Sequence, residues 1–125
     1  MQSEKYFTIF KSIAKFFSVL GNVDRVRILA LLLERPRDVK EIHELLNISQ
    51  PRTSQSLKIL KMHHIISEKK AGKHVYYSLK DEEVAETIDK VFKLKSIELS
   101  TEKGEESILR ELTHLWHKKI QNENV

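Results

Sequence analysis

The sequence predicts a mainly α-helical protein with one small β-hairpin, in the order α-α-α-α-β-β-α-α. Apolar residues recur at helical spacing over most of the chain, whereas residues 65–79 are rich in β-forming residues around a single glycine. A chain of 125 residues is large enough for one sizeable core. We therefore expect residues 1–125 to form a single domain.

The composition narrows the classes of function. The chain has no cysteine, which excludes disulfides, thiolate metal sites and cysteine nucleophiles. No stretch approaches the roughly 20 apolar residues of a membrane span, and the N-terminus lacks a signal-peptide pattern, so we expect a cytoplasmic protein without a membrane partner. The net charge is +4, and the segment from Arg35 to Lys80 holds ten Lys and Arg residues against four acids. This local excess indicates a polyanionic partner.

The first three helices are read from apolar spacing and helix-end residues. Residues 4–20 carry an apolar arc too wide for one contact surface, so one side is expected to meet the domain and the other a partner. Gly21 is expected to end this helix in a left-handed conformation, and Asn22 to cap a second helix at about 23–34. Arg25 and Arg27 in that helix could reach phosphates or pair with nearby acids. A short third helix begins near Val39.

The stretch from residue 49 to 63 is the most informative. Asn47 is expected to close the third helix in a left-handed conformation, Ser49 to cap the next helix, and Pro51 to lie in its first turn. Thr53, Leu57 and Leu60 form the inward stripe. The outward residues have the side chains that read bases in a major groove or contact phosphates: Gln50, Arg52, Ser54, Gln55 and Lys58. Two helices joined by so short a turn predict a helix-turn-helix, although an ordinary solvated helix would show a similar face.

The hairpin at 65–79 is the next feature. Its two β-rich runs, residues 65–70 and 73–79, flank Ala71-Gly72 as the turn and predict a two-stranded wing. Four cationic or titratable residues gather at the tip: Lys69, Lys70, Lys73 and His74. They could contact backbone phosphates or a narrow minor groove, or serve only as charges that protect the strand edges.

Two further helices are expected after the wing. Asp81 is expected to cap the first, whose apolar stripe includes Ile88, Val91 and Phe92. Residues 98–104 are polar and read as a linker, and residues 105–121 as a last amphipathic helix. The expected DNA-binding core is about 22–80, and the helices at about 4–20 and 81–121 are expected to form a dimer. The residues assigned to its interface are Phe7, Phe10, Phe16, Phe17, Ile88, Val91 and Phe92.

The residues also carry a family resemblance, to the ArsR/SmtB family of prokaryotic winged helix-turn-helix repressors. Four stretches carry it: VLGNVDRVRIL at 19–29, NISQP at 47–51, LKIL at 57–60 and GKHVYYSL at 72–79. The resemblance implies a homodimer held by the first and last family helices, and repression of an operator that a ligand relieves.

Many members of that family sense metals through ligands at two recurrent sites. The thiolate site falls near residues 37–40, which contain no cysteine, and the second site retains Asp81 but has Glu83, Leu94 and Ile97 in place of its histidines. We therefore expect no metal at the usual sites and no cofactor. His114 and His117 are three apart on a helix and could form a non-standard zinc site, although both face away from the apolar stripe.

The sequence contains no phosphate-binding glycine loop and no supported Ser-His-Asp arrangement, so we expect no enzyme. The residues and the resemblance together predict a homodimeric repressor of a two-fold symmetric double-stranded operator, with residues 49–63 in the major groove and 65–79 on the backbone or minor groove. The alternatives are a winged helix used for protein contacts, and a metal-responsive repressor with a non-standard histidine site.

Overall fold

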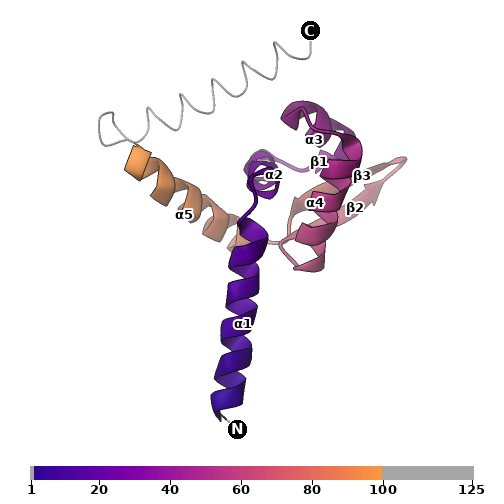
Figure 1. Cartoon of the computed structure of the whole chain (residues 1–125). Coiled ribbons are helices and arrows are strands. Elements are labelled where there is room, and N and C mark those ends of the chain that lie inside the picture. The colour runs from indigo at the N-terminus through magenta and orange to yellow at the C-terminus, as the bar shows by residue number, and fades with distance from the viewer. Residues whose placement is uncertain (1, 100–125) are drawn as a thin grey trace.

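The computed structural model describes residues 2–99, and two of its helices extend away from a body that the other elements form (Figure 1). Five helices and three short strands make up these residues. In order they are α1 Gln2–Leu20, α2 Val23–Glu34, β1 Arg37–Asp38, α3 Val39–Leu46, α4 Gln50–Met62, β2 Ile66–Ala71, β3 His74–Leu79 and α5 Glu82–Leu99. The expected order is confirmed up to α5, apart from β1. Several expected features lie outside the described residues: most of the linker, the last helix at 105–121, and His114 and His117.

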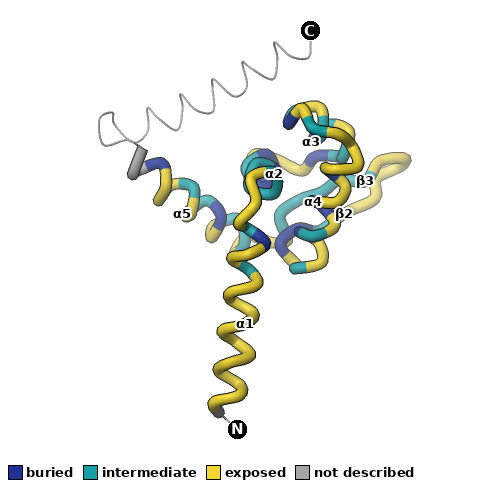
Figure 2. The backbone as a smooth tube through the Cα atoms, in the orientation of Figure 1, coloured by how far each residue is buried: buried dark blue, intermediate teal, exposed yellow. Residues whose placement is uncertain are grey.

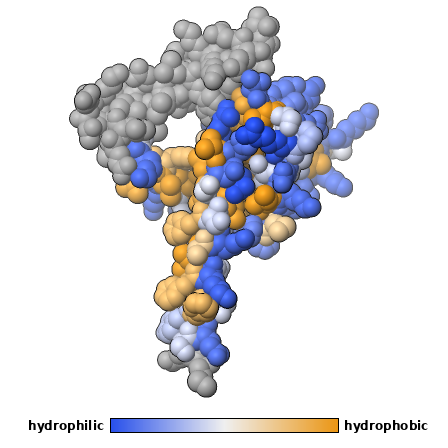
Figure 3. All heavy atoms as spheres, in the orientation of Figure 1, coloured by the Kyte–Doolittle hydropathy of each residue, from blue (hydrophilic) through white to orange (hydrophobic). Residues whose placement is uncertain are grey.

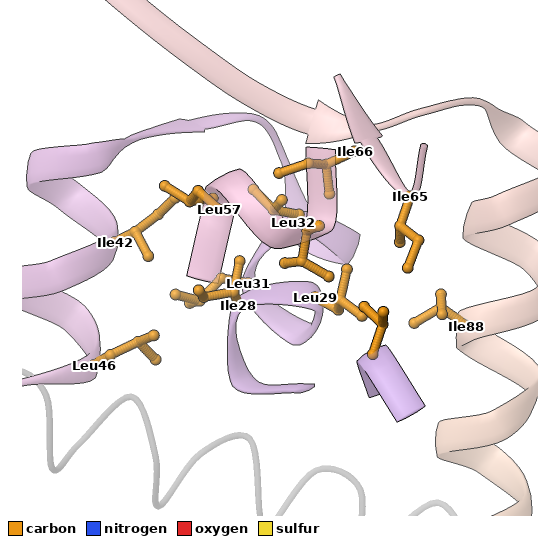
Figure 4. Close-up of a cluster of buried hydrophobic side chains, with 12 residues drawn as sticks. Ile28, Leu29, Leu31, Leu32, Ile42, Leu46, Leu57, Ile65, Ile66 and Ile88 are labelled. Carbon is orange, nitrogen blue, oxygen red and sulfur yellow. The ribbon is translucent and has the colours of Figure 1, made fainter. Parts of the chain in front are cut away.

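The core is built around α2, which α3, α4 and α5 contact (Figure 4). Ile28, Leu29, Leu31 and Leu32 of α2 are all buried. The other buried apolar residues are Val19, Ile42, Leu46, Leu57, Leu60, Ile65, Ile66 and Ile88. Burial of Leu57 and Leu60 fixes which side of α4 faces inward, and so which side faces solvent.

Polar side chains define where the helices begin. Asn22 accepts a hydrogen bond from the Arg25 amide at 3.1 Å, and Asp81 accepts one from the Val84 amide at 2.9 Å. Both caps were expected. Asp38 caps α3 in the same way, through the Glu41 amide at 2.8 Å. Each cap satisfies an amide that has no partner within the helix.

The hairpin belongs to a three-stranded antiparallel sheet in the order β1-β3-β2. The third strand, β1, has two residues, Arg37 and Asp38, paired with Tyr77 and Tyr76 of β3. The expected order of elements omitted this strand. Two residues cannot show the alternation by which a strand is recognised in a sequence.

Arg37 holds β1 against the helices and is 5% exposed. Its Nε donates to the Leu31 carbonyl at 3.1 Å, and its terminal nitrogens bind Glu34 and Glu41, both at 2.7 Å. Glu41 also binds the exposed Arg35. A buried guanidinium requires such partners, because an uncompensated charge in the interior is costly.

Helix α1 meets the body through its last turn (Figures 1 and 2). Val19 is buried, Phe16 and Leu20 pack against the core, and Arg25 Nε donates to the Val19 carbonyl at 2.6 Å. The expected left-handed conformation of Gly21 is wrong. The Gly21 amide bonds to the Ser18 carbonyl at 3.1 Å, and the extended Asn22 starts α2 at once, so no left-handed residue is needed.

The remaining turns of α1 carry an exposed apolar surface, which we call the α1 ridge (Figure 3). It consists of Tyr6, Phe7, Ile9, Phe10, Ile13 and Phe17. Val19 follows Phe17 by two positions, about 200° around a helix, so the buried residue and the centre of the ridge lie on opposite sides. Most of the apolar arc is therefore exposed in the described chain.

Candidate nucleic-acid interface

Helices α3 and α4 are joined by a tight turn at residues 47–49. Asn47 has a φ of 55° and ψ of 46°, the expected left-handed conformation. Its amide and that of Ile48 donate to the carbonyls of Glu44 and His43, both at 3.2 Å. The turn satisfies the carbonyls at the end of α3 and redirects the chain into α4.

Helix α4 begins as expected and presents the expected face. The Ser49 hydroxyl accepts from the Arg52 amide at 3.2 Å, and the Thr53 hydroxyl donates to the Ser49 carbonyl at 3.0 Å. Thr53, Ser56, Leu57 and Leu60 are buried. All five side chains assigned to DNA from this stretch are exposed: Gln50, Arg52, Ser54, Gln55 and Lys58. The helix therefore presents amide, hydroxyl and cationic groups on one side.

The wing is a regular hairpin from Ile66↔Leu79 to Ala71↔His74. Its turn is Gly72-Lys73, one residue later than expected, and Gly72 takes the left-handed φ of 64°. Lys69, Lys70, Lys73 and His74 are all exposed near this turn. The structure therefore brings the four side chains to the same end of the hairpin.

Ion pairs that the sequence did not reveal hold the ends of α4. Arg52 binds Asp24 of α2 through two hydrogen bonds of 2.6 and 2.9 Å. Lys61 binds Glu68 of β2 at 2.5 Å. These partners are 28 and seven positions apart in the sequence, so no local spacing rule could have found them. The two pairs tie α4 to α2 and to the wing.

The Lys61 pair has a pH consequence. Its hydrogen bond to the Glu68 carboxylate lowers the pKa of Glu68 below its usual value of 4.5, while burial raises the pKa of Tyr77, which lies opposite Glu68. Because the folded state has the lower carboxyl pKa, the Lys61–Glu68 pair stabilises the fold above the ordinary pKa. That contribution is lost as the pH falls through the folded value.

The cations of the interface thus fall into two groups. Arg52 and Lys61 are paired with acids, and His74 Nδ1 lies 3.4 Å from an Asp38 oxygen, an ion pair when the histidine is protonated. Within residues 2–99, no ion pair joins an acid to the other four cations, Lys58, Lys69, Lys70 and Lys73. These lysines are exposed and can contact an external anion.

Arg25 and Arg27 each donate a hydrogen bond to a backbone carbonyl at the end of a neighbouring helix. Arg25 donates to the Val19 carbonyl, and Arg27 Nη2 donates to the Leu46 carbonyl at 3.1 Å. Both arginines are half-buried, and their acceptors lie in the last residues of α1 and α3. Their role in the described structure is to connect α2 to α1 and α3.

The residues assigned to a dimer interface divide between the surface and the core. Phe7, Phe10 and Phe17 are exposed on α1, and Val91 is exposed on α5 together with Leu94. Phe16 and Phe92 are half-buried against the chain's own core, and Ile88 is 3% exposed within it. The exposed members form the surface that a second chain could cover.

Asp81, Glu83 and Leu94, which correspond to ligand positions of the family's second metal site, lie at the start of α5 and along it. Asp81 caps α5, and Glu83 and Leu94 are exposed along that helix. Within residues 2–99, no three His, Cys, Asp or Glu side chains are grouped so as to hold a metal ion. None of the helices in this part of the chain is long and apolar enough to cross a membrane.

Comparisons with known proteins agree with this geometry. Residues 22–68 match the family model described as "Bacterial regulatory protein, arsR family". The chain is 37% identical over 81 residues to a cadmium resistance transcriptional regulatory protein CadC homolog of Staphylococcus aureus, covering 64% of this chain and 67% of that protein. It is 30% identical over 74 residues to a transcriptional repressor SmtB homolog of Synechocystis sp., covering 59% of this chain and 56% of that protein.

A solved structure shows the same fold. It is the winged helix-turn-helix DNA-binding domain of a possible ArsR-family transcriptional regulator from Mycobacterium bovis, described as homodimeric. The TM-score is 0.71 at 24% identity, over 76% of this chain and 88% of that one. The named relatives are transcriptional regulators and not enzymes, as expected for this chain. The chain therefore belongs to the ArsR family of bacterial regulatory proteins, which are transcriptional regulators with a winged helix-turn-helix fold.

Proposed function

We propose that the protein is a homodimeric repressor that binds a two-fold symmetric operator, with α4 in the major groove and the wing on the backbone or minor groove. The observation that carries this proposal is the two-sided character of α4. Its apolar side is buried, and Gln50, Ser54 and Gln55 are exposed on the other side. The name of the Synechocystis relative, a transcriptional repressor, supports the sign of regulation.

The outward face of α4 has the chemistry of direct readout. A glutamine amide can bind the N6 and N7 edge of adenine through two hydrogen bonds, and a serine hydroxyl can contact several bases. Gln50, Ser54 and Gln55 are therefore assigned to base edges. Selection of bound sequences from a random duplex library tests the proposal, because recovery of no preferred sequence would contradict it.

Charged residues of α4 and the wing are assigned to phosphates. Lys58 lies on α4, and the others lie on the wing: Lys69, Lys70, Lys73 and His74. Each phosphate contact releases counterions, so affinity should fall steeply between low and moderate salt. An apolar protein contact, the alternative use of this fold, would show little salt dependence.

We propose a dimer because a second chain would bury the exposed apolar side chains of the α1 ridge and of Val91 and Leu94. Monomeric proteins rarely leave large apolar patches exposed to water. One dimer also places two recognition helices roughly 34 Å apart, one turn of DNA. The homodimeric relative from Mycobacterium bovis supports the same assembly.

Changing Gln55 to Ala is expected to weaken binding to the selected operator by about 1–3 kcal/mol and to relax preference at one base pair in each half-site. Lys58→Ala is the matched control, since it removes a charge from the same helix. It should weaken all sequences alike and reduce the salt slope by about one. Unchanged affinity and preference in Gln55→Ala would contradict the assigned groove face.

We also propose that the protein is not a metal sensor at the usual family sites, because Glu83, Leu94 and Ile97 replace the ligands there. Low-micromolar zinc should leave operator affinity unchanged in a fluorescence anisotropy titration. Zinc retained through dialysis, and lost in His114→Ala and His117→Ala, would instead support a non-standard histidine site.

A further inference from the structure

The bond between Arg52 and Asp24 fixes a guanidinium group at the start of the recognition helix. Arg52 follows Ser49, Gln50 and Pro51 in the first turn of α4. Its Nε lies 2.6 Å from Asp24 Oδ2 and its Nη2 lies 2.9 Å from Asp24 Oδ1. Two parallel hydrogen bonds of this kind set the plane of the guanidinium as well as its position.

Asp24 is suited to hold that group. It lies in the first turn of α2, where a carboxylate is favoured by the helix dipole, and its side chain is 12% exposed. The Arg52 side chain is 60% exposed. The acid is therefore the anchored member of the pair, and the arginine is the member that faces solvent.

The hydrogen bonds that Arg52 has left determine what it can bind. A guanidinium has five N–H donors, and Asp24 takes one from Nε and one from Nη2. The remaining three lie on Nη1 and Nη2, at the end of the side chain away from the carboxylate. Two of them can donate in parallel to the O6 and N7 acceptors of a guanine.

Charge decides between a base and a phosphate as the partner. The Arg52–Asp24 pair has no net charge, so it attracts a phosphate less than the unpaired Lys58 does, and the carboxylate repels that anion. The acceptors of guanine are neutral, and binding them does not require net positive charge. Arg52 also lies one helical turn from Gln55, at a spacing of three residues on the same side of α4.

We propose that Arg52 reads a guanine in each operator half-site and that Asp24 is the positioning residue that aims it. Asp24 thereby becomes a determinant of sequence specificity without touching DNA. The inference rests on the proposed function, since it requires α4 to lie in the major groove. It predicts that the two residues control preference at the same base pair.

The test is a comparison of binding to all single-base variants of the selected operator. In the wild type, replacing one guanine per half-site should weaken binding about tenfold or more. Asp24→Asn should remove most of that discrimination. It should also strengthen binding to unrelated DNA and steepen its salt dependence, because Arg52 then carries an uncompensated charge.

Arg52→Gln should lose discrimination at the same base pair without gaining affinity for unrelated DNA. The double variant should lose no more discrimination than Arg52→Gln alone. Arg52→Lys retains the positive charge but lacks the two parallel donors, so it should lose discrimination at that base pair as Arg52→Gln does. This result does not depend on whether Asp24→Asn folds. A purely structural role for Asp24 would change affinity for every sequence alike.

Three outcomes would overturn the proposal. In the first, the wild type selects an operator but its base preference does not depend on Arg52. In the second, the wild type selects an operator, and Asp24→Asn is folded and keeps the guanine preference. In both cases the proposed function stands and only this inference fails. In the third, the wild type selects no operator, and the proposed function fails together with this inference.

Discussion

Replacing Phe10 with Glu is expected to yield a monomer whose core remains folded and whose operator binding is at least about 100-fold weaker. Phe10 is 63% exposed in the single chain, so the substitution removes little from the core. In the proposed dimer it would place an unpaired carboxylate in the interface, at a cost of about 3 kcal/mol or more. Sedimentation velocity measures the mass, and anisotropy measures the affinity.

Ser12→Glu is the matched control for this prediction. Ser12 is exposed two residues further along α1, about 200° from Phe10, so it adds the same charge on the side away from the α1 ridge. That variant should remain a dimer with nearly unchanged binding. A dimeric Phe10→Glu protein with wild-type affinity would show that the α1 ridge does not form the interface. Ile88 is a poorer target, because its burial in the chain's own core would confound dissociation with unfolding.

Arg37→Ala is expected to lower the free energy of unfolding by about 3 kcal/mol. The change removes the group that bonds the Leu31 carbonyl, Glu34 and Glu41 together, and leaves β1 without its link to α2. Urea denaturation of the wild type and the variant, at the same protein concentration, measures the difference.

Arg35→Ala provides an internal comparison, because Arg35 binds the same Glu41 carboxylate. The Arg35 side chain is 56% exposed, and a pair in contact with water contributes less than about 1 kcal/mol. Equal losses in the two variants would mean that burial of Arg37 adds nothing to its effect. A large loss of unfolding free energy in Arg37→Ala, with little loss in Arg35→Ala, would show that the buried hydrogen bonds of Arg37 contribute most of the effect.

The helices could be predicted because their signals are local. Asn22, Ser49 and Asp81 are capping residues that lie just before apolar stripes, and the structure places a helix after each. The outward side of α4 followed from the burial of Thr53 and Leu57 on the other side. These features depend on residues three or four positions apart, which a sequence displays directly.

Features that join distant segments could not be predicted in this way. Strand β1 exists because Arg37 and Asp38 meet β3, about 40 positions later, and its two residues have no pattern of their own. The Arg52–Asp24 pair likewise requires the tertiary packing of α4 on α2. Arg52 was correctly read as an exposed side chain of the recognition helix, but its acidic partner was visible only once the fold was known.

In the proposed dimer, the order of α1 depends on association, because this helix contacts its own chain through its last turn. Most of the stability of a helix in a protein comes from tertiary packing, and the turns of α1 that carry Phe7 and Phe10 are exposed in the described chain. Their backbone amides should therefore exchange with solvent rapidly in dilute solution and slowly once chains associate. Near the dissociation constant of the proposed dimer, a rise in protein concentration would then increase the fraction of chains with an ordered α1 as well as the number of dimers that can occupy an operator.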